Sequence, residues 1–404
     1  MLWLNRLDRV AICWQGRDSA VFAVKEVNVF PRHLRWFVPG LAVLVFIGCH
    51  SKPGYHGPYV YRPQAKVVAK RPPARLVPPR VVTPRPMPPN PPSVPVAFPV
   101  TPRPAPAPPP GYKIRLGGED WVSLAKWGQF RGGGRLTKIP QGREVQRRLE
   151  LNGVVFEIIP GSRLITCNGV QVWLGFAPRT VKGHLYVHAL DLRKNLEPLI
   201  TGMPGLGRVV VIDPGHGRDN YGTRSSYNST TEKVYTLDWA LRLKPLLEAK
   251  GWQVFLTRAG DKNMGLTDRV KFADRVKASL FISLHFNAAA RGVRGLETYC
   301  ISPMGMPSHF TRGYPDLKDK LLPNNSYDHA NLQLAARVHS SLLGTCGMPD
   351  RGIRHVRFMT VLKGQRRPAI LVEGGYLSNP TEARLVHTAA YRQKLAEGIA
   401  NALP

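Results

Sequence analysis

The chain has 404 residues and a formal net charge of +31, and this length can hold two domains with hydrophobic cores. So basic a chain is typical either of nucleic-acid binders or of proteins that work beside anionic cell envelopes. The five cysteines form no CxxC pair, which argues against cysteine-based zinc and redox sites.

Residues 32–49, RHLRWFVPGLAVLVFIGC, have the pattern of a targeting segment. Basic residues precede an apolar run that is too short for a comfortable membrane span. The run ends in FIGC, which resembles a bacterial lipoprotein signal whose cysteine, here Cys49, becomes the lipidated first residue. Two alternatives stay open: residues 36–48 remain as an uncleaved anchor, or they form a buried helix. We predict that residues 1–49 export the protein and anchor it to a membrane, which weakens the nucleic-acid hypothesis.

Residues 50–111 are predicted to form a disordered, basic linker. The stretch 51–110 contains no Asp or Glu and is dense in proline, as in RPPARLVPPRVVTPRPMPPNPP. Such a composition cannot bury a core and favours extended polyproline geometry. We expect a semi-rigid spacer whose Arg and Lys side chains tolerate or attract anionic polymers.

Residues 112–205 are predicted to form a small, β-rich α+β domain. Turn signals at Pro160-Gly161, Asn168-Gly169 and Lys182-Gly183 separate several short strands. The strand spacing and the NGVQVWL hairpin resemble the stalk domain named for the N-terminal region of copper amine oxidases. No copper-ligand cluster is present, so we predict a positioning role.

From residue 206 to the end, strands and helices alternate. This alternation predicts an α/β fold with a mostly parallel sheet flanked by helices. Strands are expected at 209–212, 252–258, 279–287, 295–302 and 368–375, and helices at 231–250, 266–278, 329–347 and within 380–403.

Three apolar runs in this part each end in a side chain that can bind a metal or move a proton. VVVIDPGHG leads to His216, SLFISLHFN to His285, and PAILVEGG to Glu373. The carboxyl ends of parallel strands meet at one edge of a sheet, where ligands bind in open α/β folds. His216 taken alone could equally be a polar loop residue. Glu232 stands where a helix begins, so capping or charge–dipole pairing is an alternative role for it.

The motifs VIDPGHG, TEK, LTRAGD, LTDRV, FISLHFN, DRGIR and ILVEGGYLSN occur in this order within 206–404. This part resembles the catalytic domain of the zinc-dependent (type 3) N-acetylmuramoyl-L-alanine amidases, which cut the amide between N-acetylmuramic acid and the L-alanine of the peptidoglycan stem peptide. The resemblance implies that His216, Glu232 and His285 hold Zn²⁺ and that Glu373 is the catalytic carboxylate. The chain departs from the family pattern at DNYGT and in the Gly-Gly-Tyr after Glu373. We expect that neither departure touches a ligand.

Several questions stay open at this stage. Asp213 is either an indirect partner of the metal site or, as we prefer, a strand-end turn former. Arg269 and Arg351 lie in family motifs and either bind substrate or brace loops. Residues 303–328 receive no role. We also expect residues 50–204 to be dispensable for chemistry on soluble muropeptides, because every predicted site residue lies beyond 206.

Other functions remain as alternatives. A zinc peptidase that cuts within the stem peptide would use the same residues. A non-catalytic cell-wall-binding regulator would be expected to lack ligands, and none of the four is missing. A nucleic-acid binder rests on charge alone, and we find no recognition motif. The leading prediction is a membrane-anchored amidase in the bacterial cell envelope. Its activators, oligomeric state and stem-peptide preference are not predicted.

Overall fold

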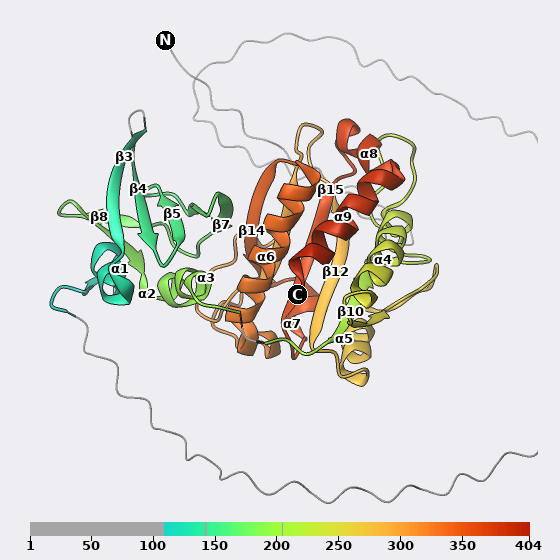
Figure 1. Cartoon of the computed structure of the whole chain (residues 1–404), viewed down its shortest axis with the longest axis horizontal. Helices are drawn as coiled ribbons and strands as arrows, with labels where there is room; N and C mark the ends of the chain where they lie inside the picture. Colours follow the sequence, from blue (N-terminus) through green and yellow to red (C-terminus); the bar gives the residue numbers. More distant parts are fainter. Residues whose placement is uncertain (1–108, 142–143, 204) are drawn as a thin grey trace, which may run out of the picture. The chain divides into compact units, whose positions relative to one another are not determined.

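The computed structural model describes residues 109–141, 144–203 and 205–404 (Figure 1). These residues fall in one compact unit. The predicted targeting segment and all but the end of the predicted linker lie outside them, so both stay predictions. None of the helices in the described part is long and apolar enough to cross a membrane.

The predicted catalytic half of the molecule, after residue 205, contains six strands in the order β11-β10-β12-β15-β13-β14. All neighbouring pairs are parallel except β13 and β15. The predicted α/β fold with a mostly parallel sheet is therefore confirmed. The strands are β10 (Val209–Pro214), β11 (Gln253–Leu256), β12 (Leu280–Asn287), β13 (Leu296–Ile301), β14 (Asp350–Val356) and β15 (Ala369–Tyr376).

Helices cover both faces of this sheet. Side chains of α4, α6 and α9 join one buried cluster, in which α6 and α9 lie side by side (Figure 1). Side chains of α5 and α7 join a second cluster on the other face. The helices are α4 (Glu232–Glu248), α5 (Leu266–Arg275), α6 (Asp328–Cys346), α7 (Thr360–Lys363), α8 (Pro380–His387) and α9 (Ala389–Ala402).

The sequence pattern places Leu237, Leu241 and Leu247 near one apolar face of α4, but the buried face in the structure differs. Trp239, Leu243 and Leu247 are fully buried, whereas Leu241 is 47% exposed. Residues four apart share a helix face, and Leu241 lies two positions from both Trp239 and Leu243, so it projects to the far side.

The preceding β-rich region consists mainly of antiparallel strands. β1 (Lys113–Leu116), β2 (Glu119–Ser123), β9 (His184–His188) and β8 (Arg179–Val181) form a four-stranded sheet. A meander runs through β3 (Arg135–Gln141), β4 (Glu144–Leu151), β5 (Val154–Ile158), β6 (Leu164–Cys167) and β7 (Val170–Trp173). The helical segments are α1 (Leu124–Gly132), α2 (Ala189–Asp191), a π-helical turn (Leu192–Leu196) and α3 (Glu197–Ile200). The predicted turn at Asn168-Gly169 links β6 to β7, with both residues at positive φ.

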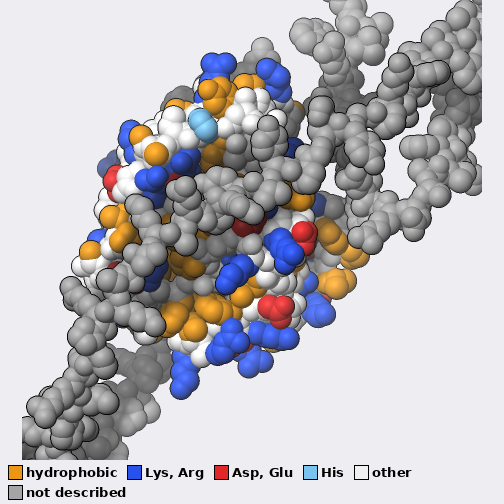
Figure 2. All heavy atoms as spheres, turned by 90° about the vertical axis from the view of Figure 1, so that its right-hand side faces the viewer, with side chains coloured by type: hydrophobic (Ala, Val, Ile, Leu, Met, Phe, Trp, Pro, Cys, Tyr) orange, Lys and Arg blue, Asp and Glu red, His pale blue; other side chains and the backbone are white. Residues whose placement is uncertain are grey.

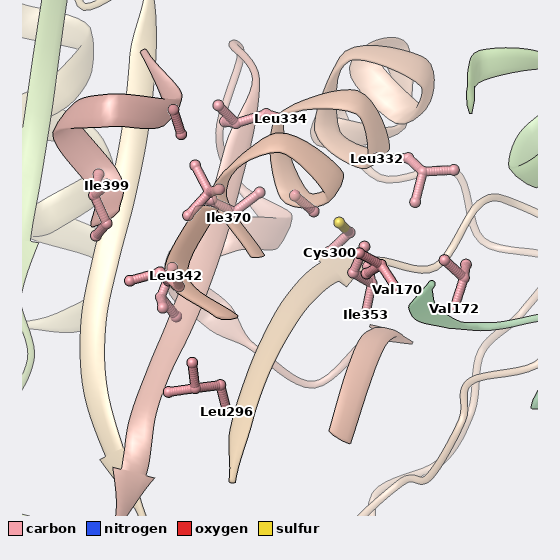
Figure 3. Packing of buried hydrophobic residues seen from close by; sticks show 14 of the residues in the cluster. Val170, Val172, Leu296, Cys300, Leu332, Leu334, Leu342, Ile353, Ile370 and Ile399 are labelled. Carbon is pink, nitrogen blue, oxygen red and sulfur yellow. The ribbon is translucent and has the colours of Figure 1, made fainter. Parts of the chain in front are cut away.

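Strand β7 joins the β-rich region to the catalytic sheet. Val172 pairs with Ile353 of β14, which extends the sheet to 11 strands. The backbone N–H of Gln171 donates to Asp350 Oδ2 at 2.7 Å. In Figure 3, Val170 and Val172 lie beside Ile353, and these side chains belong to the same buried cluster as α6. The sheet and its hydrophobic core thus contain residues from both sides of residue 205. The division of the chain into two domains at this residue stays a prediction.

Candidate functional site

The three predicted strand-end side chains lie at one edge of the catalytic sheet. His285 of β12 and Glu373 of β15 are Cα partners on neighbouring parallel strands. β10 ends at Pro214, and the following Gly215 donates its N–H to the carbonyl of Leu284 at 3.0 Å. A Cβ on Gly215 would overlap the ring of His285, so the glycine makes room for this imidazole.

His216 lies in the loop after β10 in an unusual backbone conformation. Its φ is +65°, in the left-handed region that few non-glycine residues adopt. Its Nδ1 lies 2.7 Å from Asn220 Oδ1, and its carbonyl accepts a 2.7 Å bond from Arg269 Nη2. These contacts hold the ring so that Nε2 points to Glu232 Oε2 at 3.0 Å. The structure thus places the His216 ring beside Glu232, and its metal-binding role stays a prediction.

Glu232 is the first residue of α4, and its buried carboxylate bridges the two histidines. Oε1 lies 2.9 Å from His285 Nδ1 and also accepts from the backbone N–H of Phe286 at 3.0 Å. Oε2 accepts from the N–H of Thr223 at 3.0 Å. The side chain thus bonds to distant backbone and leaves the N–H groups of its own helix alone, so the capping interpretation is wrong. Asn220 and Thr223 both belong to DNYGT, so the expectation that this stretch touches no ligand is wrong.

The donor atoms of His216, Glu232 and His285 all lie within 4.8 Å of one another. Burial alone would raise the pKa of Glu232, but hydrogen bonds from both histidines outweigh it and hold the pKa well below its usual range. Burial alone would lower the pKa of His216, but its hydrogen bond to Glu232 raises the pKa overall. Two imidazole nitrogens and one carboxylate oxygen are a ligand set typical of catalytic zinc sites. The residues therefore fit a metal ion without rearrangement of the strands.

Glu373 is 6% exposed, and its Oε2 has no hydrogen-bond partner among the described residues. Burial raises the pKa of this carboxyl well above its usual range, and the charges of Glu232 and Glu297 raise it further. An unpartnered buried carboxyl is costly, so its position beside the histidine pair calls for a functional explanation.

Asp213 and Arg269 brace the His216 loop. Both are buried and form an ion pair, and Asp213 also accepts from Thr257 at 2.6 Å and Ser283 at 2.7 Å. Arg269 donates to the carbonyls of Pro214 at 2.9 Å and His216. Asp213 lies inside β10, so our preferred turn-former interpretation is wrong. Arg269 holds the loop, and it reaches the site only through backbone carbonyls.

Glu297 of β13 extends the row of side chains and was missed from the sequence. It is the Cα partner of Glu373 and is buried. Its carboxylate accepts from Tyr299 at 2.6 Å and Asn287 at 2.8 Å, and it pairs with two arginines of β14. The lone acidic residue inside the apolar strand GLETYCIS was the signal that could have found it.

Comparisons with known proteins identify the family to which the C-terminal half of the chain is similar. The family pattern of the N-acetylmuramoyl-L-alanine amidases matches residues 210–404. The probable cell wall amidase LytH of Staphylococcus epidermidis is 30% identical over 226 residues, which cover 55% of this chain and 67% of that protein. The N-acetylmuramoyl-L-alanine amidase AmiA of Escherichia coli is 31% identical over 215 residues, which cover 48% of this chain and 74% of that protein.

A solved structure also matches. The catalytic domain of CwlV, an amidase from Bacillus (Paenibacillus) polymyxa var. colistinus, is 29% identical with a TM-score of 0.41, covering 49% of this chain and 96% of that one. The family match begins at residue 210, so the resemblance of residues 112–205 to a stalk domain stays a prediction. The chain belongs to the N-acetylmuramoyl-L-alanine amidases, the peptidoglycan hydrolases that cut the amide between N-acetylmuramic acid and the L-alanine of the stem peptide.

Proposed function

We propose that this amidase uses a zinc ion held by His216, Glu232 and His285, with Glu373 as the catalytic carboxylate. The observation that carries the proposal is the row at the sheet edge: three converging donor atoms, with an unpartnered carboxyl on the next strand. When bound, zinc would supply Lewis-acid chemistry, which makes water more acidic and withdraws electrons from the amide carbonyl.

Glu373 moves the protons in this proposal. Its Oε2 is free to accept a proton from the attacking water and to pass it to the departing alanine nitrogen. An amine leaves poorly without a proton, so one carboxyl serves both transfers. Gly215 and Gly222 leave space around the donors, because a Cβ on Gly222 would lie 2.5 Å from Glu232 Oε2 and 2.7 Å from His216 Cδ2.

Digestion of purified peptidoglycan, followed by mass analysis of the products, tests which bond is cut. We expect intact stem peptides with a free alanine amino group. Cuts within the peptide would favour the peptidase alternative, and the absence of products would favour a non-catalytic regulator. A preparation freed of metal should give no products until zinc is added.

We also propose that the protein works in the bacterial cell envelope, tethered through its N-terminal segment. Similarity to relatives such as the probable cell wall amidase LytH supports an envelope location. The net charge of +31 suits work beside anionic polymers, and Lys and Arg side chains are prominent on the face shown in Figure 2. Replacement of Cys49 by Ser should abolish lipid labelling if this cysteine is the anchor, and unchanged labelling would rule it out.

A further inference from the structure

Arg351 of β14 lies beside the row of side chains at the sheet edge, which consists of His216, His285, Glu373 and Glu297. We call these side chains the catalytic row. One side of the Arg351 guanidinium is unpaired in the described structure. Its Nε donates to Glu297 Oε1 at 2.9 Å and to the Tyr376 hydroxyl at 3.1 Å, and the guanidinium lies over the Tyr376 ring. Neither Nη atom has a hydrogen-bond partner in the described part of the chain, and the side chain is 32% exposed. The Nε side of the guanidinium is therefore held by Glu297 and Tyr376, and the side that carries the two Nη atoms faces solvent.

The charges around Arg351 favour the binding of an anion at its guanidinium. Glu297 is the carboxylate that both Arg351 and Arg354 contact, and Arg354 Nη2 lies 3.0 Å from the same oxygen. One carboxylate and two guanidiniums leave one net positive charge, and the opposite charges of the nearby Glu382 and Arg294 offset each other. Because Arg354 is only 9% exposed, the accessible part of that charge lies on Arg351. A planar fork with two free N–H groups is suited to a carboxylate.

The position of Arg351 indicates which part of the substrate its guanidinium can reach. Glu373 must reach the departing alanine nitrogen, so the stem peptide leaves on the Glu373 side of the histidines. Glu297 is the next residue of the row, about 5 Å away across one strand spacing, and Arg351 contacts it. Two residues of extended peptide span at most about 7 Å. A carboxylate on the residue after alanine can therefore reach the guanidinium.

Trp173 of the β-rich region holds the backbone that carries Arg351. Its Nε1 donates to the carbonyl of Arg351 at 3.3 Å. Its ring packs on Gly352, where a Cβ would lie 3.0 Å from Trp173 Cδ1, and the Arg354 guanidinium lies over the ring at 5.1 Å from its centroid. One side chain from β7 thus contacts three residues of β14.

We propose that Arg351 binds a carboxylate of the stem peptide, on the residue that follows L-alanine, and that Trp173 is the positioning residue for Arg351. The inference rests on the proposed function and adds a determinant of substrate choice. It also gives the β-rich region a part in substrate recognition.

Two soluble substrates test this inference with the full chain. They are N-acetylmuramoyl-L-alanyl-D-glutamate with the γ-carboxyl blocked as the amide and the α-carboxylate free, and the same molecule with both carboxyls amidated. We expect the wild-type kcat/KM to favour the carboxylate by about tenfold or more, as for one charge-assisted hydrogen bond. In Arg351→Ala this ratio should fall to near one, with the change mainly in KM, while zinc content stays normal. Arg337→Ala is the matched control, because Arg337 is exposed on α6, a helix that packs on the opposite face of the sheet.

The role of Trp173 is tested by its coupling to Arg351. Trp173→Ala should lower the ratio, and Trp173→Phe, which keeps a ring on Gly352, should restore part of it. In the Arg351→Ala background the Trp173→Ala change should lower the ratio no further. If Arg351→Ala unfolds, Arg351→Lys serves in its place, because it keeps a charge for Glu297 but loses the fork, so the ratio should again fall.

The outcomes separate the two proposals. If wild type cuts both substrates equally, or if Arg351→Ala keeps the wild-type ratio, the inference is wrong while the proposed function stands. An independent loss from Trp173→Ala in the Arg351→Ala background would overturn the positioning role. If wild type cuts neither substrate, the proposed function fails and the inference fails with it.

Discussion

The two halves of the 11-stranded sheet are built from different kinds of strand. In the catalytic half, β12 and β15 are buried along almost their whole length, whereas β6 and β7 alternate buried and partly exposed residues. Strands covered on both faces can offer side chains to a substrate only near their ends. Strands with an open face can offer a side chain at any position along their length, as β7 does with Trp173. Functional residues are therefore easier to find from sequence in the catalytic half.

Metal removal is the test with the largest expected effect on the catalytic half. Chelation should abolish activity, and added zinc should restore it, because the proposed chemistry has no other electrophile. His285→Ala should lower both bound zinc and rate, since loss of a ligand weakens binding itself. Metal analysis beside the rate measurement checks this. Full activity of a zinc-free preparation would contradict the proposal.

Glu373→Gln separates catalysis from metal binding within the row. The amide is nearly the size of the carboxyl, so fold, zinc and peptidoglycan binding should survive. It cannot accept the water proton, and turnover should fall by on the order of 10²–10⁴-fold. Zinc content, unfolding temperature and kcat of the purified variant are the measurements.

Glu232→Gln is the variant to compare with Glu373→Gln, and Glu248→Gln is the control for both. The first should lose zinc because Glu232 bridges both histidines, and the second should change nothing because Glu248 is exposed at the end of α4. Loss of zinc from the Glu373 variant together with normal zinc in the Glu232 variant would reverse the two assignments.

The limits of sequence-based prediction follow from the same contrast between the halves. The apolar runs before His216, His285 and Glu373 have a local pattern, so their strands and common edge could be predicted. β14 could not, because DRGIRHV places charged residues inside a strand, and their partners are distant in the chain. The pairing of Val172 with Ile353 joins residues that are far apart in sequence, and no local signal marks it.

Removal of the β-rich region tests whether the halves are independent. The sequence favours an active fragment starting near 205, but the structure gives a reason to expect the opposite. Such a fragment would expose Ile353 and the free edge of β14. We expect it to unfold at a lower temperature than the full chain or to aggregate. Thermal unfolding and activity on a soluble muropeptide check this, and a fragment as stable and as active as the full chain would show that the halves are independent.

A single substitution at the junction gives a milder form of the same test. Ile353 is fully buried between β7 and α6, so Ile353→Ala should lower the free energy of unfolding by about 2–5 kcal/mol. Ile353→Val, which keeps most of the side chain, should cost about 0.5–1.5 kcal/mol. Denaturant unfolding of both variants measures the difference. Equal stability of Ile353→Ala and wild type would mean that the junction contributes little to the fold.

The smallest change in the free energy of unfolding is expected from a substitution on α4, where the sequence pattern and the structure disagree. A predicted apolar face containing Leu241 implies a large cost for its replacement, whereas in the structure this side chain is 47% exposed and Leu243 is fully buried. Leu241→Gln should therefore change the free energy of unfolding by no more than about 0.5 kcal/mol. Leu243→Ala should cost about 2–5 kcal/mol, because it leaves a cavity between α4 and the sheet. Denaturant unfolding of the two variants checks the pair, and a larger cost at Leu241 would mean that α4 is rotated relative to the structure. Such a rotation would also move Glu232 at the start of the helix, so normal zinc binding in Leu241→Gln is the second expected result.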